Sequence, residues 1–186
     1  MASEGAPTHS RLFFALWPDD TARRRLAALV EEFHGLYGGR RVATSSLHIT
    51  LAFLGETPNS QVPALEALAR EVDAAVFDLV LTVASAWGRG VFWLAPRDVP
   101  PQLADLATQL QAKLRGAEVR FDDRPFVAHL TLMRNAKYPG GTLSIEPVEL
   151  RMRDFVLVRT VFATNGASHE VIGRFPLRSP LGSLGA

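Results

Sequence analysis

The 186-residue sequence contains no cysteine, which excludes disulfides, thiolate metal sites and a cysteine nucleophile together. It also lacks any run of about 18 apolar residues, so no segment is expected to span a membrane. Lys and Arg number 20 and Asp and Glu 19, and a net charge of +1 gives no strong overall field for nucleic acid. Any recognition of phosphate must therefore be local.

The overall composition is that of an ordinary globular protein, with 47% apolar and 21% charged residues. A chain of this length forms one domain, or two small lobes that share a core. Residues 1–10 lack the apolar core of a signal peptide, and we expect them to form a short disordered leader. Together with the absence of cysteine, this favours a cytoplasmic protein.

Helical and strand patterns alternate along the chain. Apolar residues recur at helical spacing over 21–33, 62–76 and 101–114. Strands are expected over 12–17, 47–54, 77–84, 91–94, 127–133, 148–153, 155–162 and 170–175. An Asn-Gly pair at 165–166 favours a hairpin, and the connections are short. These features predict an α+β protein with largely antiparallel sheets.

Two of the expected strands carry the same pair of polar residues. His48 and Thr50 share one face of the first strand, while apolar residues such as Phe53 share the other. His129 and Thr131 repeat this arrangement in the second strand. A single histidine in an apolar strand is most simply a hydrogen-bonded core residue. Two matching copies in a chain with five histidines favour a functional site instead.

The repeated strand also predicts the overall organisation. We expect two pseudo-symmetric lobes, each with a largely antiparallel sheet flanked by helices, and an active cleft between them. The lobes would form one domain over residues 11–177, followed by a C-terminal tail over 178–186, and the protein would be a monomer. The cleft would bring together His48, Thr50, His129 and Thr131.

Two imidazoles can serve as a general base and a general acid near neutral pH, and two hydroxyls can bind an anionic oxygen. A serine-type triad needs a buried carboxylate that neither strand supplies. Two imidazoles are also too few ligands for a metal ion, so we expect neither a metal nor another cofactor. Acid–base chemistry on a small anion remains. In-line attack at phosphorus fits this pair of residues, because the entering and leaving oxygens lie on opposite sides and one histidine would stand on each side.

Three segments together resemble a known family: Arg-Leu-Phe-Phe-Ala at 11–15, Ser-Leu-His-Ile-Thr-Leu-Ala-Phe-Leu-Gly-Glu at 46–56 and Arg-Pro-Phe-Val-Ala-His-Leu-Thr-Leu-Met-Arg at 124–134. They are similar to the RNA 2',3'-cyclic phosphodiesterase branch of the two-histidine phosphoesterase superfamily, long called the bacterial 2'-5' RNA ligase family. The resemblance implies a bilobal α+β fold and metal-independent hydrolysis of RNA 2',3'-cyclic phosphate ends to 2'-phosphomonoesters. Some members of the family also carry out reversible 2'-5' RNA ligation.

The resemblance also implies roles for individual residues. His48 corresponds to the general acid that protonates the departing 3'-oxygen, and His129 to the base that activates water. Thr50 and Thr131 would hold the non-bridging phosphate oxygens. Arg134 matches an arginine of the family that binds substrate. The near symmetry of the two motifs leaves the order of acid and base open.

Three further residues have two interpretations each. Arg134 lies at an odd offset from His129, so it reaches the cleft only if the strand ends or bulges near Met133, and otherwise it is a surface residue. Phe13 would bind substrate by stacking on a base at the cleft mouth, or would pack in the core. His169 would be a third titratable group near the cleft, or a solvated residue of the last hairpin.

Other substrates and another class of protein remain open. The enzyme could act on 2'-5' linked oligonucleotides or on an ADP-ribose cyclic phosphate instead of RNA ends. Alternatively, the cleft could bind RNA ends or nucleotides without catalysis. Analysis of products after incubation with a cyclic phosphate distinguishes an enzyme from a binding protein.

Overall fold

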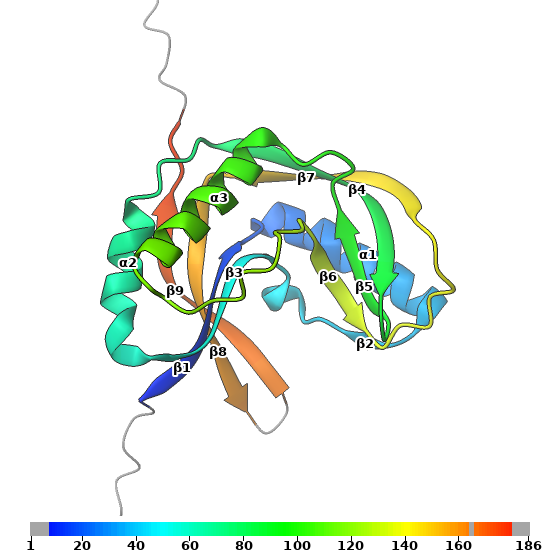
Figure 1. The fold of residues 1–186 in the computed structure, drawn as a ribbon. Coiled ribbons are helices and arrows are strands. Elements are labelled where there is room, and N and C mark those ends of the chain that lie inside the picture. Colours follow the sequence, from blue (N-terminus) through cyan, green and yellow to red (C-terminus); the bar gives the residue numbers. More distant parts are fainter. Residues whose placement is uncertain (1–7, 164–165, 180–186) are drawn as a thin grey trace, which may run out of the picture.

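The strands form one nine-stranded sheet in the computed structural model, which describes residues 8–163 and 166–179 (Figure 1). The strands are β1 (His9–Leu16), β2 (Arg40–Arg41), β3 (Ile49–Pro58), β4 (Phe77–Trp87), β5 (Val91–Ala95), β6 (Leu130–Arg134), β7 (Leu143–Met152), β8 (Asp154–Ala163) and β9 (Gly166–Pro176). They run in the order β7-β4-β5-β6-β3-β1-β8-β9, and the short β2 pairs with β6. Every pair of named strands is antiparallel. The predicted α+β class with antiparallel strands is confirmed.

The α-helices are α1 (Asp20–Tyr37), α2 (Val62–Arg70) and α3 (Pro101–Gly116), and two 3-10 turns are η1 (Thr44–Ser46) and η2 (Asn59–Gln61). Asp19 caps α1, because its carboxylate accepts the backbone N–H of Ala22 at 2.8 Å. The helix predicted over 62–76 ends at Arg70 instead. Beyond it the backbone N–H of Asp73 donates to the side chain of Gln109 on α3, which draws the chain away from the helix.

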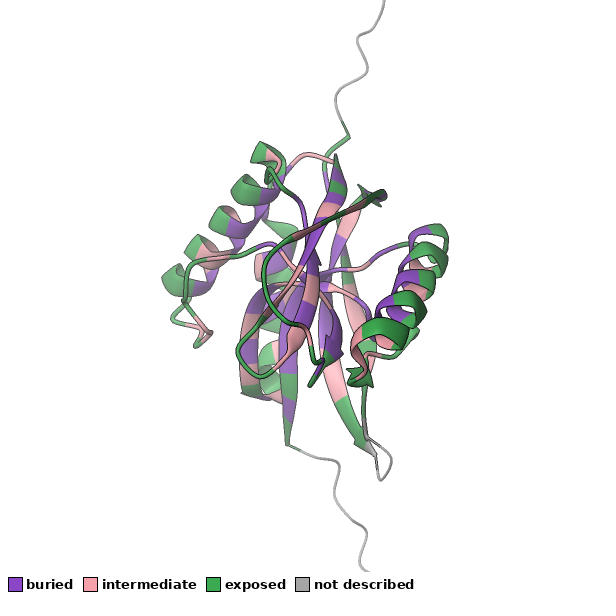
Figure 2. Ribbon diagram, turned by 90° about the vertical axis from the view of Figure 1, so that its right-hand side faces the viewer, coloured by how far each residue is buried: buried purple, intermediate pink, exposed green. Residues whose placement is uncertain are grey.

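The sheet consists of two halves that meet at a single residue pair. One half contains β7, β4, β5 and β6, and the other contains β3, β1, β8 and β9. Between β6 and β3 only Ile49 and Leu130 are paired. Buried residues follow the sheet and the inner faces of the helices, whereas the outer helix faces are exposed (Figure 2). The predicted lobes are therefore two halves of one continuous sheet.

Each half of the sheet is covered by a helix that, along the sequence, connects two neighbouring strands of the other half. Helix α1 connects β1 to β3, yet it packs against β6 and β7. The ring of Phe33 on α1 lies 5.0 Å from the ring of Phe92 on β5. Conversely, α3 connects β5 to β6 and packs against β3 and α2. The units β1–α1–β3 and β5–α3–β6 are thus equivalent and exchange their helices, as Figure 1 shows.

The predicted end segments are more ordered than expected. Strand β1 begins at His9, inside the leader predicted over 1–10, and Ser10 is buried. Arg178, placed in the tail, forms a parallel bridge with Ala75. The Asn-Gly turn includes 164–165, which lie outside the described residues. Among the helices described, none is long and apolar enough to cross a membrane.

Candidate active site

Both motif histidines lie where the two halves of the sheet join. His48 directly precedes Ile49, the first residue of β3, and His129 directly precedes Leu130, the first residue of β6. Because Ile49 and Leu130 are the residues that pair across the halves, the two histidines are brought to the same place. The pairing of two short apolar segments therefore builds the site.

The histidines open onto a cleft with a volume of about 720 Å³. It contains all six residues that the sequence analysis assigned to the site. The lining residues are Arg11, Phe13, Arg40, Arg41, Val42, Ala43, Ser46, His48, Thr50, Phe53, His129, Thr131, Arg134, Thr160, Phe162, Ala167 and His169.

The cleft has a strongly basic lining. Four of the lining residues are arginines, and among the described lining residues none is acidic. Arg41 forms an ion pair with Glu31 on α1, which partly neutralises it. Arg134 is exposed at the end of β6. A chain with a net charge of +1 thus concentrates positive charge at one place, as local recognition of phosphate requires.

The two histidines hold the same tautomer by the same means. The Nδ1–H of His48 donates to the carbonyl of Ser46 at 2.7 Å, and that of His129 donates to the carbonyl of Val127 at 2.8 Å. A carbonyl only accepts, so Nδ1 carries the proton and Nε2 is the reactive nitrogen. In the neutral ring of His48, Nε2 accepts the hydroxyl proton of Thr50 at 3.2 Å.

Burial lowers the pKa of both histidines from the ordinary value of 6.5. For His48 the pKa falls to about 4, because burial dominates and the hydrogen bond to Ser46 opposes it only in part. Repulsion from His169, His129 and Arg23 lowers this pKa further. Burial also lowers the pKa of His129. In the free protein both rings are therefore neutral at pH 7, with His48 the harder of the two to protonate.

Strand β6 contains the bulge on which the position of Arg134 depends. Thr131 and Met133 pair with consecutive residues of β5, which leaves Leu132 as an extra residue on β6. A bulge reverses the alternation of side chains beyond it. Consequently Arg134 lines the same cleft as Thr131, despite its odd offset.

Strand β3 has the same bulge at the equivalent position. Thr50 and Ala52 pair with consecutive residues of β1, and Leu51 is the extra residue. Regular alternation predicted Phe53 on the face opposite His48, and this prediction is wrong, because after the bulge Phe53 lines the cleft. Phe53 in one half and Arg134 in the other thus occupy equivalent positions.

Phe13 lines the cleft but offers little surface to a nucleobase. Its side chain is only 3% exposed, and its ring lies 4.8 Å from His48 and 5.1 Å from His169. Of the two interpretations, packing describes this ring better than stacking on a base. A more open ring at the cleft is that of Phe162, which is 64% exposed.

Of the two interpretations of His169, the structure favours a titratable group at the cleft. Its ring is 5.4 Å from the ring of His48 and nearly perpendicular to it. Trp17 stacks on His48 from another side, at 5.6 Å with an angle of 14° between the planes. Neither ring carries a local sequence signal for this role, because the contacts depend on the pairing of β1 with β3 and β8. Arg40 and Arg41, which form β2, also line the cleft.

A second hollow of about 620 Å³ adjoins the cleft and shares Thr50, Phe53 and His129 with it. Trp87, which is 40% exposed, stands at its wall, and the ring of Trp87 lies 4.6 Å from that of His129. Each of the two histidines therefore packs against a tryptophan, in a stacked arrangement for His48 and an edge-on arrangement for His129.

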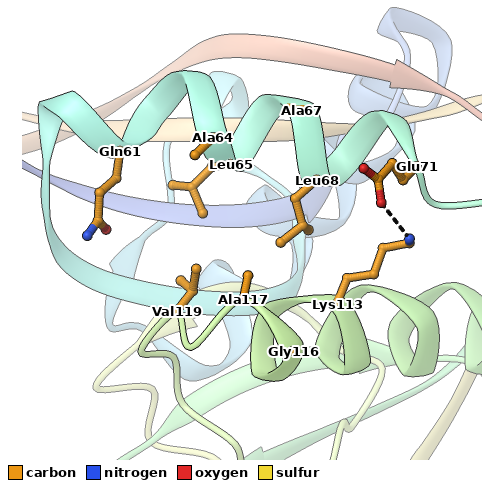
Figure 3. A pocket seen from close by; sticks show the side chains of 10 residues that line it. All are labelled: Gln61, Ala64, Leu65, Ala67, Leu68, Glu71, Lys113, Gly116, Ala117 and Val119. Carbon is orange, nitrogen blue, oxygen red and sulfur yellow. Dashed lines mark hydrogen bonds and ion pairs between the residues drawn. The ribbon is translucent and has the colours of Figure 1, made fainter.

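A third hollow, of about 540 Å³, lies away from the histidines between α2 and the end of α3 (Figure 3). Its wall consists largely of alanine and leucine side chains, and Lys113 and Glu71 form an ion pair of 3.0 Å at one end. This groove contains no histidine among its lining residues, unlike the cleft. Within residues 8–163 and 166–179, no three His, Asp or Glu side chains are grouped to hold a metal ion.

Comparison with known proteins gives a consistent result. A family model described as LigT like Phosphoesterase matches residues 16–93 and 94–160, and each matched segment contains one of the two motifs. An RNA 2',3'-cyclic phosphodiesterase of Escherichia coli (strain K12) is 36% identical over 172 residues, which cover 90% of this chain and 96% of the relative. A protein of the same description from Thermus thermophilus is 31% identical over 189 residues and 92% of each chain.

Solved structures resemble the fold over nearly its whole length. The crystal structure of Escherichia coli LigT complexed with 3'-AMP has a TM-score of 0.80 and 31% identity, and covers 91% of this chain and 98% of that one. A crystal structure of a Thermus thermophilus protein has a TM-score of 0.75 and 25% identity, with the same coverage of both chains.

Proposed function

Because the chain belongs to the LigT like phosphoesterase family, we propose that it hydrolyses 2',3'-cyclic phosphate ends of RNA to 2'-phosphomonoesters. The observation that carries the proposal is the pair of His48 and His129, which direct their Nε2 atoms to one arginine-lined cleft. Relatives described as RNA 2',3'-cyclic phosphodiesterases support the substrate class.

The proposed reaction needs one proton removed and one supplied. Neutral His129 accepts a proton from water through Nε2 as the water oxygen attacks phosphorus. The bond between phosphorus and the 3'-oxygen breaks on the opposite side, and protonated His48 gives its Nε2 proton to that oxygen. The phosphate stays on the 2'-oxygen. Afterwards His48 is neutral and His129 is protonated, and exchange with solvent restores the starting state.

Neighbouring side chains bind the phosphate in this proposal. The hydroxyls of Thr50 and Thr131 donate to its non-bridging oxygens, and the Arg134 guanidinium supplies a permanent charge and two parallel donors. Phe13 contributes by supporting His48 rather than by contacting a base directly. These groups come from β1, β3 and β6, so all of them are fixed by the sheet.

The low pKa of His48 sets a condition on its role as the acid. In the free protein this pKa is about 4, so the ring is mostly neutral at pH 7. A bound phosphate diester carries a negative charge, and an opposite charge nearby raises the pKa of an imidazole. Substrate binding therefore promotes the protonation that His48 needs in order to act.

We also propose that the protein acts as a monomer in the cytoplasm. Both histidines of the site belong to one chain, so the site needs no residue from a second subunit. The absence of cysteine is compatible with a reducing compartment.

The test is to digest an oligonucleotide that ends in a 2',3'-cyclic phosphate, in excess EDTA, and to determine which oxygen keeps the phosphate. We expect a 2'-phosphomonoester and no loss of rate on chelation. His48→Ala and His129→Ala should each lower turnover by about a hundredfold or more. His9→Ala is the matched control, since His9 is exposed and does not line the cleft. Unchanged cyclic phosphate after binding would indicate a binding protein, and a 3'-phosphate would refute the proposed roles.

A further inference from the structure

Arg23 lies in the first turn of α1 and does not line the cleft, yet its contacts lead to His48. Its Nε–H donates to the carbonyl of Pro18 at 3.0 Å, and an Nη–H donates to the carbonyl of Thr44 at 2.5 Å. The second Nη atom is buried and has no hydrogen-bond partner among the residues that the structure describes. A charged group placed in this way is costly to bury, so its position calls for a reason beyond helix stability.

The guanidinium contacts both supports of the His48 ring. It lies 4.9 Å above the ring of Trp17, and Trp17 in turn stacks on His48. Thr44, whose carbonyl accepts from Arg23, is the first residue of η1, and Ser46 at the end of η1 accepts the Nδ1–H of His48. The indole of Trp17 therefore contacts both the cation and the imidazole, and the same cation anchors the turn that fixes the tautomer.

Among the residues that the structure describes, those around His129 form no equivalent arrangement. Trp87 contacts His129 edge-on, at an angle of 70° between the rings, rather than face to face. In the described part of the chain no arginine lies over the ring of Trp87. The two histidines thus have similar backbone supports but different side-chain supports.

We propose that Arg23 is a positioning residue for His48, which fixes the plane and the tautomer of the imidazole through Trp17 and the η1 turn. A planar, permanently charged group suits this position, because it covers an aromatic face and donates to two carbonyls in fixed directions. Lysine keeps the charge but cannot make all three contacts. This inference rests on the proposed role of His48 in hydrolysis.

The first measurement needs no substrate. The imidazole signals of His48, assigned by their loss in His48→Gln, are followed by NMR as a function of pH in the wild type, Arg23→Met and Arg25→Met. Arg25 is the matched control, since it lies two residues further along α1 and is exposed. We expect Arg23→Met to raise the pKa of His48, because a cation is lost and the ring becomes more accessible, and Arg25→Met to leave it unchanged. Equal titrations in the two variants would overturn the proposal.

The second measurement is the kinetic effect on hydrolysis of a cyclic phosphate end. Misplaced catalytic groups slow the reaction without weakening binding, so Arg23→Met should lower kcat by about tenfold or more with KM changed less than about twofold. Arg23→Lys should give an intermediate kcat. An unchanged kcat with a raised KM would mean that Arg23 contacts substrate, and this result would also overturn the proposal.

A variant at Trp17, the ring that contacts both Arg23 and His48, separates positioning from folding. If Arg23→Met is unfolded by circular dichroism, Trp17→Phe takes its place, and it should also raise the pKa of His48. In folded variants the effects of Arg23→Met and Trp17→Phe on that pKa should be less than additive, because both act on one stack. If the two pKa changes add in full, Arg23 and Trp17 act on His48 independently, and the proposal is refuted. If the protein does not hydrolyse cyclic phosphates, the titration of Arg23→Lys still decides whether Arg23 positions His48, because this variant keeps the charge and a rise in its pKa cannot come from a lost cation alone.

Discussion

His48 and His129 present the same nitrogen to the cleft but are not equally easy to protonate. Three rings surround His48, namely those of Phe13, Trp17 and His169. This burial explains why its pKa falls to about 4. At the scale of single residues, the near symmetry of the motifs is thus broken by their neighbours. An acid and a base with different pKa values can arise from two copies of one motif.

The pH dependence of the reaction should reflect these depressed pKa values. The base works only when neutral, so the rate falls as the pH drops below its pKa, and the acid works only when protonated, so the rate falls above its pKa. Both pKa values lie below 6.5 in the free protein. We therefore expect kcat/KM to be bell-shaped with its maximum below pH 6.5. The profile of kcat should peak at higher pH, because bound phosphate raises both values. A maximum of kcat/KM above pH 7 would contradict the burial of the two rings.

Arg134 provides a second prediction at this scale. If its guanidinium holds the phosphate, Arg134→Met removes charge-assisted hydrogen bonds worth about 1.5–3 kcal/mol, and kcat/KM should fall roughly tenfold to a hundredfold. Steady-state kinetics with a cyclic-phosphate oligonucleotide measure this change. Arg151→Met is the control, because Arg151 is exposed on the edge strand β7. Equal kcat/KM values for Arg134→Met and Arg151→Met would show that Arg134 makes no contact with substrate.

At the scale of elements, the end of β6 depends on two glycines in other segments. Gly39 and Gly90 both have a positive φ, of 93° and 76°. A Cβ on Gly39 would lie 2.7 Å from the carbonyl oxygen of Arg134, and a Cβ on Gly90 would lie 2.7 Å from the backbone N of Ala136. The backbone that follows Arg134 is thus held between two segments that only glycine allows to approach so closely.

Substitution of Gly90 should therefore lower the free energy of unfolding more than substitution of Gly88. Gly88 belongs to the same turn and has a φ of 48°, but a Cβ there would meet nothing within 4 Å. Gly88→Ala should cost about 1 kcal/mol of unfolding free energy from backbone strain alone. Gly90→Ala adds a backbone collision and should cost about 2 kcal/mol or more. Urea denaturation measures both, and equal costs would contradict the close approach of residues 90 and 136.

The sequence predicts elements better than it predicts how they meet. The apolar spacing over 21–33 is a local signal, and it predicts helix α1 correctly, although the helix begins at Asp20 and continues to Tyr37. The extra residues Leu51 and Leu132 look like ordinary strand residues, because a bulge is defined by the partner strand. The His-x-Thr repeat identifies the catalytic candidates, whereas Trp17, Arg23 and His169 join the site through contacts between distant segments.

At the scale of the whole molecule, the two halves are joined weakly by backbone and strongly by helices. Their sheets share one residue pair, but α1 and α3 each cover the half to which they do not belong. Loss of one half would expose the apolar face of a helix from the other. We therefore expect the halves to unfold together in a single transition.

Tryptophan fluorescence can test this, because Trp17 lies in one half and Trp87 and Trp93 lie in the other. One variant keeps only Trp17, through Trp87→Phe and Trp93→Phe, and a second keeps the other two, through Trp17→Phe. For each variant, the urea transition measured by fluorescence is compared with the transition measured by circular dichroism. Both probes should follow the loss of secondary structure. A fluorescence transition that precedes it in either variant would show that the halves unfold separately.

The exchange of helices also has a consequence for the order in which the molecule can be built during synthesis. Helix α1 ends at Tyr37, but the strands against which it packs come much later: β5 begins at Val91, β6 at Leu130 and β7 only at Leu143. The apolar face of α1, with Leu26, Leu29 and Phe33, therefore leaves the ribosome long before its partner exists. Until then that face is open to water, to the ribosome surface or to a chaperone. The active cleft is completed only when most of the chain has emerged.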